Sequence, residues 1–109
     1  MSLVAVTGCQ GYVGAHLVER LRADGYDVVG IDHRAPRDVS LTRFTRVELA
    51  DPESVEVCRD ALRGCSAVFH LASHQPFSWD LFPFVRGNVI RTAHLLEAMQ
   101  DRYAPQLCL

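Results

Sequence analysis

The 109-residue sequence contains no lysine and a single asparagine, Asn88. All 11 basic residues are therefore arginines, and this chain alone cannot run a reaction that needs a lysine amine. The longest apolar runs, such as residues 3–6, are far too short to cross a bilayer. No basic segment precedes the first run, as a secretory signal would require. We therefore expect a cytoplasmic protein with no membrane partner.

Cysteine and net charge are also scarce. The four cysteines show no C-x-x-C spacing and are too sparse for a disulfide scaffold, so we expect reduced thiols that pack in the core. A reactive thiol at Cys9, close to a predicted helix N-terminus, is the alternative. The net charge of −2 gives no electrostatic footprint for nucleic acid. The hydrophobic content of 49% and the length fit one folded domain over residues 1–109.

Short β-branched runs alternate along the chain with helical periodicity. The predicted strands cover residues 3–6, 28–31, 44–49 and 67–71, and a last strand beginning at Gln106 is left open. The predicted helices cover residues 12–23, 51–63 and 80–102. Apolar strands that alternate with helices indicate a parallel sheet covered on both faces. With right-handed crossovers, the fold class is α/β with a doubly wound (Rossmann) sheet, truncated after about four strands.

The apolar spacing also predicts which helix faces are buried. In the first helix, the face carries Val13, Leu17 and Leu21. In the last helix, it carries Val85, Val89, Thr92, Leu96 and Met99. Asp51 precedes Pro52 at the start of the middle helix, where its side chain is expected to cap the helix.

A glycine-rich segment at residues 7–14 joins the first strand to the first helix. Gly8 allows a tight turn out of the strand, Gly11 lets a pyrophosphate approach the backbone, and Gly14 lets the helix pack closely on the sheet. The helix N-terminus then offers free N–H groups and the positive end of a dipole to phosphates. Together with the strand before it and the helix after it, this spacing predicts a dinucleotide site.

An acidic residue, Asp32, ends the second predicted strand. A carboxylate there accepts hydrogen bonds from the adenosine ribose and repels a 2′-phosphate, which predicts NAD as the cofactor. Arg34 is the complication, because its guanidinium could neutralise a 2′-phosphate. NADP is therefore the less favoured alternative.

Three motifs in order resemble the extended short-chain dehydrogenase/reductase family, the NAD-dependent epimerases and dehydratases. The first is the glycine segment, in its T-G-x-x-G-x-x-G form. The second is His70-Leu71-Ala72-Ser73, similar to the family's H-x-A-[AS]. The third is residues 88–98, similar to N-V-x-G-T-x-x-L-L-E-A, with Arg91 where the family usually has glycine.

The resemblance implies roles for further residues in binding the cofactor. Backbone N–H groups of Tyr12 and Val13 would contact the pyrophosphate, and Asp51 would lie at the adenine edge. The nicotinamide half would be lined by Leu71, Ala72 and Ser73, and Asn88 would face the site from the last helix. Helix capping explains Asp51 equally well, and strand packing explains Leu71 and Ala72 equally well.

The same resemblance implies what this chain lacks. The family's catalysis uses a Tyr-x-x-x-Lys pair, so we expect no catalytic residue here and only the cofactor-binding part of an enzyme acting on a nucleotide sugar or a similar hydroxyl substrate. A non-catalytic redox-sensing module is the alternative. A homo-oligomer through the last helix is left open. His70 and His74 end a strand rather than sharing a helix face, so no metal site is expected, and His70 is expected to pack or hydrogen-bond there.

Overall fold

The computed structural model describes residues 2–37, 40–72, 81–100 and 106–108. Within them, strands and helices alternate as β-α-β-β-α-β-α-β. The elements are β1 (Leu3–Thr7), α1 (Tyr12–Ala23), β2 (Asp27–Asp32), β3 (Arg43–Arg46), α2 (Ser54–Ala61), β4 (Ala67–His70), α3 (Leu81–Ala98) and β5 (Gln106–Cys108).

All strand pairs of the sheet are parallel, and the strand order is β3-β2-β1-β4-β5. The order reverses between β1 and β4, which confirms the doubly wound α/β prediction. The expectation of about four strands is corrected, because the strand left open at Gln106 exists. It pairs with β4, with Leu107 opposite Val68, so β4 lies inside the sheet rather than at its edge.

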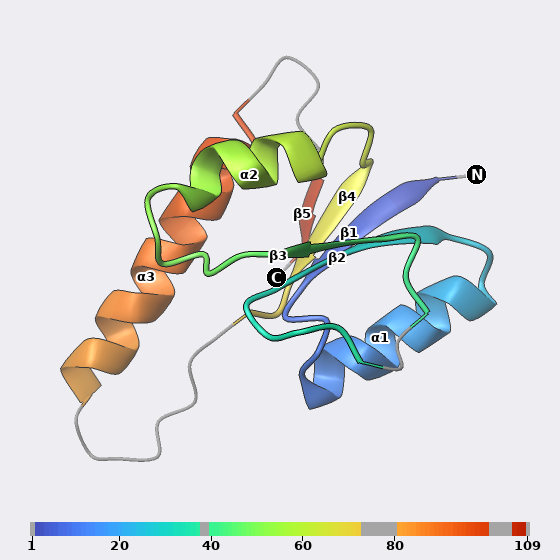
Figure 1. Cartoon of the computed structure of the whole chain (residues 1–109), viewed down its shortest axis with the longest axis horizontal. Helices are drawn as coiled ribbons and strands as arrows, with labels where there is room; N and C mark the ends of the chain where they lie inside the picture. Colours follow the sequence, from blue (N-terminus) through green and yellow to red (C-terminus); the bar gives the residue numbers. More distant parts are fainter. Residues whose placement is uncertain (1, 38–39, 73–80, 101–105, 109) are drawn as a thin grey trace.

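Helix α1 covers one face of the sheet, while α2 and α3 cover the other, as Figure 1 shows. Each face has its own core because side chains alternate along a strand. Val4 and Val6 pack with Val18 of α1 in one cluster, while Ala5 lies in the cluster that includes Leu95 of α3. The sheet is therefore buried on both sides, which explains its almost continuous apolar strands.

The predicted buried face of α1 is partly wrong. The buried residues are Gly14, Val18 and Leu21, and Val13 is 63% exposed. Val13 lies in the first turn, which borders a crevice at the end of the sheet. An apolar residue there satisfies the helical spacing without meeting the core.

The predicted face of α3 is also largely wrong. Val85, Val89 and Leu96 are exposed, whereas Leu95 and Ala98 are buried. Met99, just past the helix, is buried as predicted. Apolar residues occur on more than one side of this helix, so periodicity alone could not identify the side that packs on α2 and the sheet.

The start of α2 differs from the capping prediction. The helix begins at Ser54, and its N-cap residue, Glu53, makes no side-chain hydrogen bond to it. Asp51 contributes its backbone carbonyl, which accepts the Ser54 N–H at 3.0 Å. The buried Ser54 hydroxyl donates to the Leu49 carbonyl at 3.2 Å. The residues before α2 therefore form a turn, and Asp51 is not the cap.

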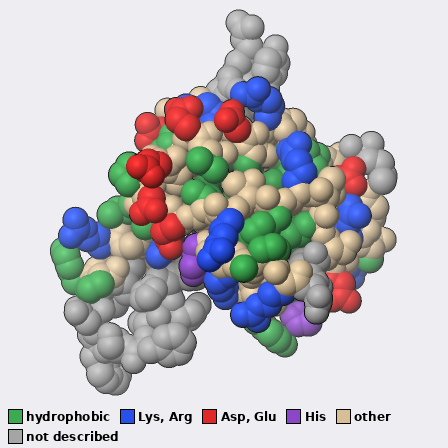
Figure 2. All heavy atoms as spheres, viewed as in Figure 1, with side chains coloured by type: hydrophobic (Ala, Val, Ile, Leu, Met, Phe, Trp, Pro, Cys, Tyr) green, Lys and Arg blue, Asp and Glu red, His purple; other side chains and the backbone are tan. Residues whose placement is uncertain are grey.

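The surface charge is unevenly distributed in Figure 2, where acidic side chains gather beside α2. Basic and histidine side chains gather below the sheet in the same view.

Within the described ranges, no helix has both the length and the apolar character that crossing a membrane needs. No group of three or more potential metal ligands of the His, Cys, Asp or Glu type comes together in that part of the chain.

Candidate dinucleotide-binding crevice

A crevice of about 580 Å³ lies where β1, β2 and β4 end. This volume is typical of small-molecule sites, and the carboxyl ends of strands near a reversal of strand order are where doubly wound sheets bind ligands. The lining residues are Gly8, Gly11, Tyr12, Val13, Gly14, Ile31, Asp32, His33, Arg34, Val47, Glu48, Leu49, Leu71, Ala72 and Arg91.

Two glycines of the loop are required by its geometry. Gly8 has φ +73°, and a Cβ there would lie 2.9 Å from the backbone nitrogen of Ala72. A Cβ on Gly14 would lie 2.1 Å from the Gly8 carbonyl oxygen. Both obstacles are backbone atoms, which a side-chain rotation cannot remove. The loop can therefore fold back on itself and on β4 only with glycine at these two positions.

The first turn of α1 faces the crevice with no side chain capping it. The N-cap residue is Gly11, as extended backbone, and Tyr12 and Val13 follow with exposed side chains. The first N–H groups of a helix have no partner within the helix, and they carry partial positive charge. A phosphate group fits this position, because it would accept those donors in a loop that carries no Cβ at Gly11.

Asp32, at the end of β2, is 4% exposed and heavily hydrogen-bonded. Its carboxylate accepts the Gln10 N–H at 2.9 Å and the Arg34 N–H at 2.9 Å. The Arg34 side chain adds two donors, Nε at 3.1 Å and Nη2 at 3.2 Å. Burial alone would raise the pKa of Asp32, but these hydrogen bonds and the Arg34 charge outweigh it and hold the pKa below its ordinary value.

These bonds occupy about four acceptor positions, which is the capacity of a carboxylate. A ribose hydroxyl can therefore reach Asp32 only if the Arg34 guanidinium moves. The Arg34 side chain is 42% exposed, so it can move into solvent when it leaves Asp32. Arg34 is thus both the partner of Asp32 and the obstacle in front of it.

A hydrogen-bonded chain joins β1, β4 and α3 beside the crevice. The Thr7 hydroxyl oxygen accepts the N–H groups of Leu71 at 3.0 Å and Ala72 at 3.1 Å. With both lone pairs engaged, the hydroxyl donates its proton to His70 Nδ1 at 2.7 Å. His70 Nε2 then carries the ring proton and donates to the Thr92 hydroxyl at 3.0 Å. This confirms hydrogen bonding by His70 and assigns it one neutral tautomer.

The environment of His70 agrees with that assignment. Burial lowers the pKa of His70 below its ordinary value of 6.5. A proton added at Nδ1 would face the Thr7 oxygen, which already accepts two N–H groups. Both effects favour the neutral ring.

Cys9 lies under the loop as a packing residue. It is fully buried, and burial together with the nearby Asp32 charge raises its pKa to about 11. The thiol is therefore protonated at neutral pH, which makes the reactive-thiol alternative wrong for this conformation.

The crevice contains most of the residues that the sequence predicted for it, but not all. Asp51 is exposed, and Asn88 is half-buried on α3; neither lines the crevice. Ser73 and His74 lie outside the described residues. Three polar lining residues, His33, Glu48 and Arg91, were not predicted from the sequence, and neither were the apolar Ile31, Val47 and Leu49. Arg91 did carry a signal, because it departs from the glycine of the resembled motif.

Comparisons with known proteins agree with this geometry. Residues 4–108 match the NAD dependent epimerase/dehydratase family. The sterol-4-alpha-carboxylate 3-dehydrogenase (decarboxylating) of Bos taurus is 35% identical over 104 residues, which are 95% of this chain and 28% of that protein. The human enzyme is 34% identical over 104 residues, with 95% and 27% covered. The chain thus spans less than a third of the length of these relatives.

Solved structures give the same result. The UDP-glucose 4-epimerase of Thermus thermophilus, in complex with NAD, has a TM-score of 0.79 and 31% identity, with 96% of this chain and 36% of that chain covered. MoeE5, in complex with UDP-glucuronic acid and NAD, has a TM-score of 0.73 and 40% identity, with 87% and 31% covered.

The fold and the crevice thus define a Rossmann domain of the dinucleotide-binding class. The chain belongs to the NAD dependent epimerase/dehydratase family. The resemblance predicted from the three motifs is confirmed, and so is NAD as the cofactor on which this family depends.

Proposed function

We propose that residues 1–109 form the cofactor-binding domain of an NAD-dependent epimerase, dehydratase or reductase that acts on a nucleotide sugar or a similar hydroxyl substrate. The observation that carries the proposal is the uncapped first turn of α1, which opens into the crevice between Gly8 and Asp32. The nucleotide-sugar epimerase and MoeE5 structures, solved with NAD, support the substrate class.

Each part of the crevice has a role in this proposal. The N–H groups of Tyr12 and Val13 bind the diphosphate, and Gly8, Gly11 and Gly14 leave room for it. Asp32 binds the adenosine ribose after Arg34 moves aside. Leu71 and Ala72, at the end of β4, line the nicotinamide half. Bound NAD would supply a hydride acceptor at that end of the crevice.

Three further contacts are proposed from the family resemblance. Asp51 and Asn88 do not line the crevice, and Ser73 lies outside the described residues. Asp51 would reach the adenine edge from the turn before α2, and Asn88 would approach from α3. Ser73 follows Ala72 and would extend the nicotinamide wall.

The chemical step belongs to residues outside this chain in our proposal. The 109 residues contain no lysine and so no Tyr-x-x-x-Lys pair. We therefore assign no catalytic residue here. An isolated sample is expected to bind NADH without turning over sugar nucleotides, and measurable turnover would contradict this assignment.

We also propose that α3 mediates self-association. Phe82, Val85, Val89 and Leu96 on this helix are exposed apolar residues, with exposed fractions between 43% and 72%. A cytoplasmic location completes the proposal. The four free cysteines support it, because three of them are buried as thiols.

The test is isothermal titration calorimetry of the purified chain with NADH and with NADPH. We expect both the binding of NADH and a preference for it, because Asp32 repels a 2′-phosphate once Arg34 has left it. A folded sample, verified by circular dichroism, that gives no heat with saturating NADH would contradict the proposed site. Tighter binding of NADPH would contradict only the cofactor preference.

A further inference from the structure

Arg91 extends from α3 into the crevice that the glycine loop also lines. Its side chain is only 18% exposed, which is unusual for an arginine. Helix α3 covers the face of the sheet opposite to α1 (Figure 1). The guanidinium therefore approaches the crevice from the side opposite to the free N–H groups of α1.

One edge of this guanidinium is fixed by Glu48. Arg91 Nε donates to Glu48 Oε1 at 2.8 Å, and the same oxygen accepts the Ala50 N–H at 3.0 Å. Burial alone would raise the pKa of Glu48, but these bonds outweigh it and hold the pKa below its ordinary value. The carboxylate is therefore ionised at neutral pH, and it positions the arginine.

The other edge of the guanidinium has an unused donor. Among the residues that the structure describes, no hydrogen-bond acceptor meets the buried Arg91 Nη1. This atom lies beside Gly87, one helical turn earlier, where an added Cβ would be 3.2 Å from it. A buried donor of a charged group without an acceptor is destabilising, so such an atom calls for an explanation.

The remaining crevice arginine cannot fill the same role in this conformation. Arg34 uses its Nε and Nη2 donors on Asp32. Two arginines line the crevice. Of these, Arg91 is the one that is largely buried and that has an N–H group with no acceptor among the described residues. A guanidinium matches phosphate oxygens in both charge and geometry.

We propose that Arg91 is a phosphate-binding residue whose guanidinium donates to an oxygen of the dinucleotide diphosphate, with Nη1 turning from its buried place beside Gly87 toward the ligand. The inference rests on the proposed function, because the diphosphate is that of the bound cofactor. Glu48 is the positioning residue, since its carboxylate orients the guanidinium. The diphosphate is then held between backbone N–H groups from α1 and one arginine from α3.

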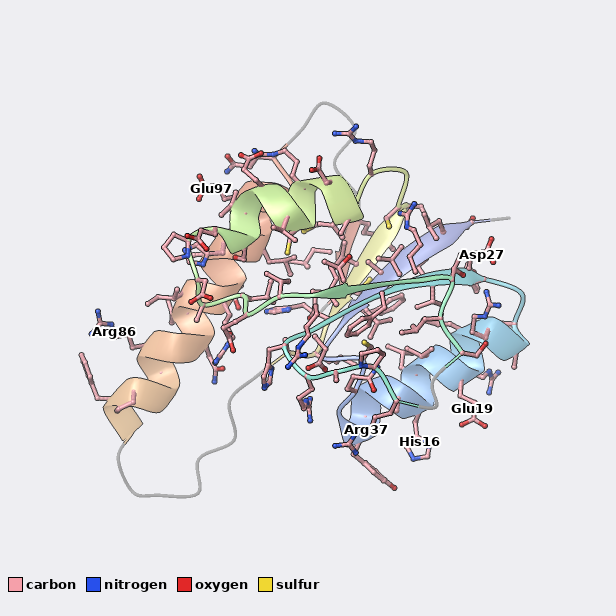
Figure 3. All side chains as sticks on the ribbon, viewed as in Figure 1. His16, Glu19, Asp27, Arg37, Arg86 and Glu97 are labelled. Atoms are coloured by element: carbon pink, nitrogen blue, oxygen red, sulfur yellow. The ribbon has the colours of Figure 1, made fainter. Side chains whose placement is uncertain are left out.

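The test compares Arg91→Met with Arg86→Met as the matched control. Arg86 lies on the same helix but is exposed, and Figure 3 shows it pointing away from the sheet. NMR-detected titrations use NADH, NADPH, ADP-ribose and adenosine, because all of these except adenosine carry the diphosphate. We expect Arg91→Met to weaken NADH and ADP-ribose alike, by about tenfold or more, and to leave adenosine and the control unchanged.

A second variant separates ligand binding from packing. Glu48→Gln keeps an oxygen that can accept the Arg91 N–H but removes a negative charge near the diphosphate. We expect it to bind NADH as tightly as the unaltered chain or more tightly, and NADH binding should depend more steeply on salt, because Glu48 no longer neutralises the Arg91 charge.

Several outcomes would overturn the inference. NADH affinity unchanged in Arg91→Met would do so, and so would an equal loss for adenosine, which would show that Arg91 acts only by packing. A loss confined to NADPH would instead assign the arginine to a 2′-phosphate. Failure of the unaltered, folded chain to bind NADH would mark the proposed function itself as wrong, before any variant is compared.

Discussion

The two sides of the crevice are built in different ways. On the α1 side, backbone atoms form the wall, and the glycines at positions 8 and 14 are required by contacts of 2.9 and 2.1 Å with other backbone atoms. On the α3 side, side chains form it, with Arg91 held by Glu48, and the hydrogen-bonded pair of His70 and Thr92 lies beside this wall.

This difference determines how each side tolerates change. A backbone wall has no rotamers, so a methyl group added at Gly8 or Gly14 displaces the loop. A side-chain wall can lose one group and keep its fold, but its hydrogen bonds depend on charge and pH. Substitutions can therefore test the two sides separately.

The largest effect is expected for Gly14→Ala on the α1 side. Its Cβ would overlap the Gly8 carbonyl, so we expect a loss of about 3 kcal/mol or more in the free energy of unfolding and no NADH binding. Gly11→Ala is the matched comparison, because its Cβ would come no closer than 3.3 Å to its neighbours. It should stay within about 1 kcal/mol of the parent and lose mainly NADH affinity. Chemical denaturation and calorimetry measure both, and equal stabilities of the two variants would contradict the comparison.

The second-largest effect is expected for Thr7→Val. Thr7 links β1 to β4 and, through His70, to α3. The variant removes the acceptor of the Ala72 N–H and the donor to His70, which should lower the free energy of unfolding by about 2 kcal/mol. Thr7→Ser keeps the hydroxyl and should retain most of the stability. Urea denaturation of the two variants measures this difference. A serine variant as unstable as the valine variant would show that stability depends on the threonine methyl group rather than on the hydroxyl.

A pH effect should distinguish the α3 side. Burial lowers the folded-state pKa of His70 below 6.5, so the unfolded state binds the proton more readily. The contribution of the neutral His70 ring to the free energy of unfolding is fully present above the ordinary histidine pKa. It is lost as the pH falls toward the lowered pKa of the folded state. The stability advantage of the parent over His70→Gln should therefore shrink between about pH 7.5 and pH 5. Thermal melts across this range measure it, and a pH-independent difference would contradict the neutral-histidine assignment.

The smallest effect is expected for Arg34→Ala, on the preference between NADH and NADPH. Arg34→Ala exposes the Asp32 carboxylate, so NADPH should bind more weakly, while NADH keeps or gains affinity. We expect the NADH-to-NADPH affinity ratio to rise by about tenfold, as judged by parallel calorimetric titrations. An unchanged ratio would mean that Arg34 does not face the 2′ position.

Much of this protein was predictable because local rules decide it. The bounds of α1 match its periodicity, and the glycine spacing places a phosphate-binding loop at its start. The errors concern long-range packing. Which side of α3 is buried depends on α2 and the sheet, and the fifth strand forms only because residues 106–108 reach β4.

The sequence by itself determined the doubly wound fold, the glycine loop and the acid at the end of β2, because strand alternation, helix periodicity and glycine conformation act over a few residues. Only the tertiary structure decided that Arg34 covers Asp32, that Thr7, His70 and Thr92 form one chain, and that Arg91 enters the crevice. Long polar side chains have many rotamers, and their partners come from distant elements, so their positions are set only when the sheet and the helices pack together.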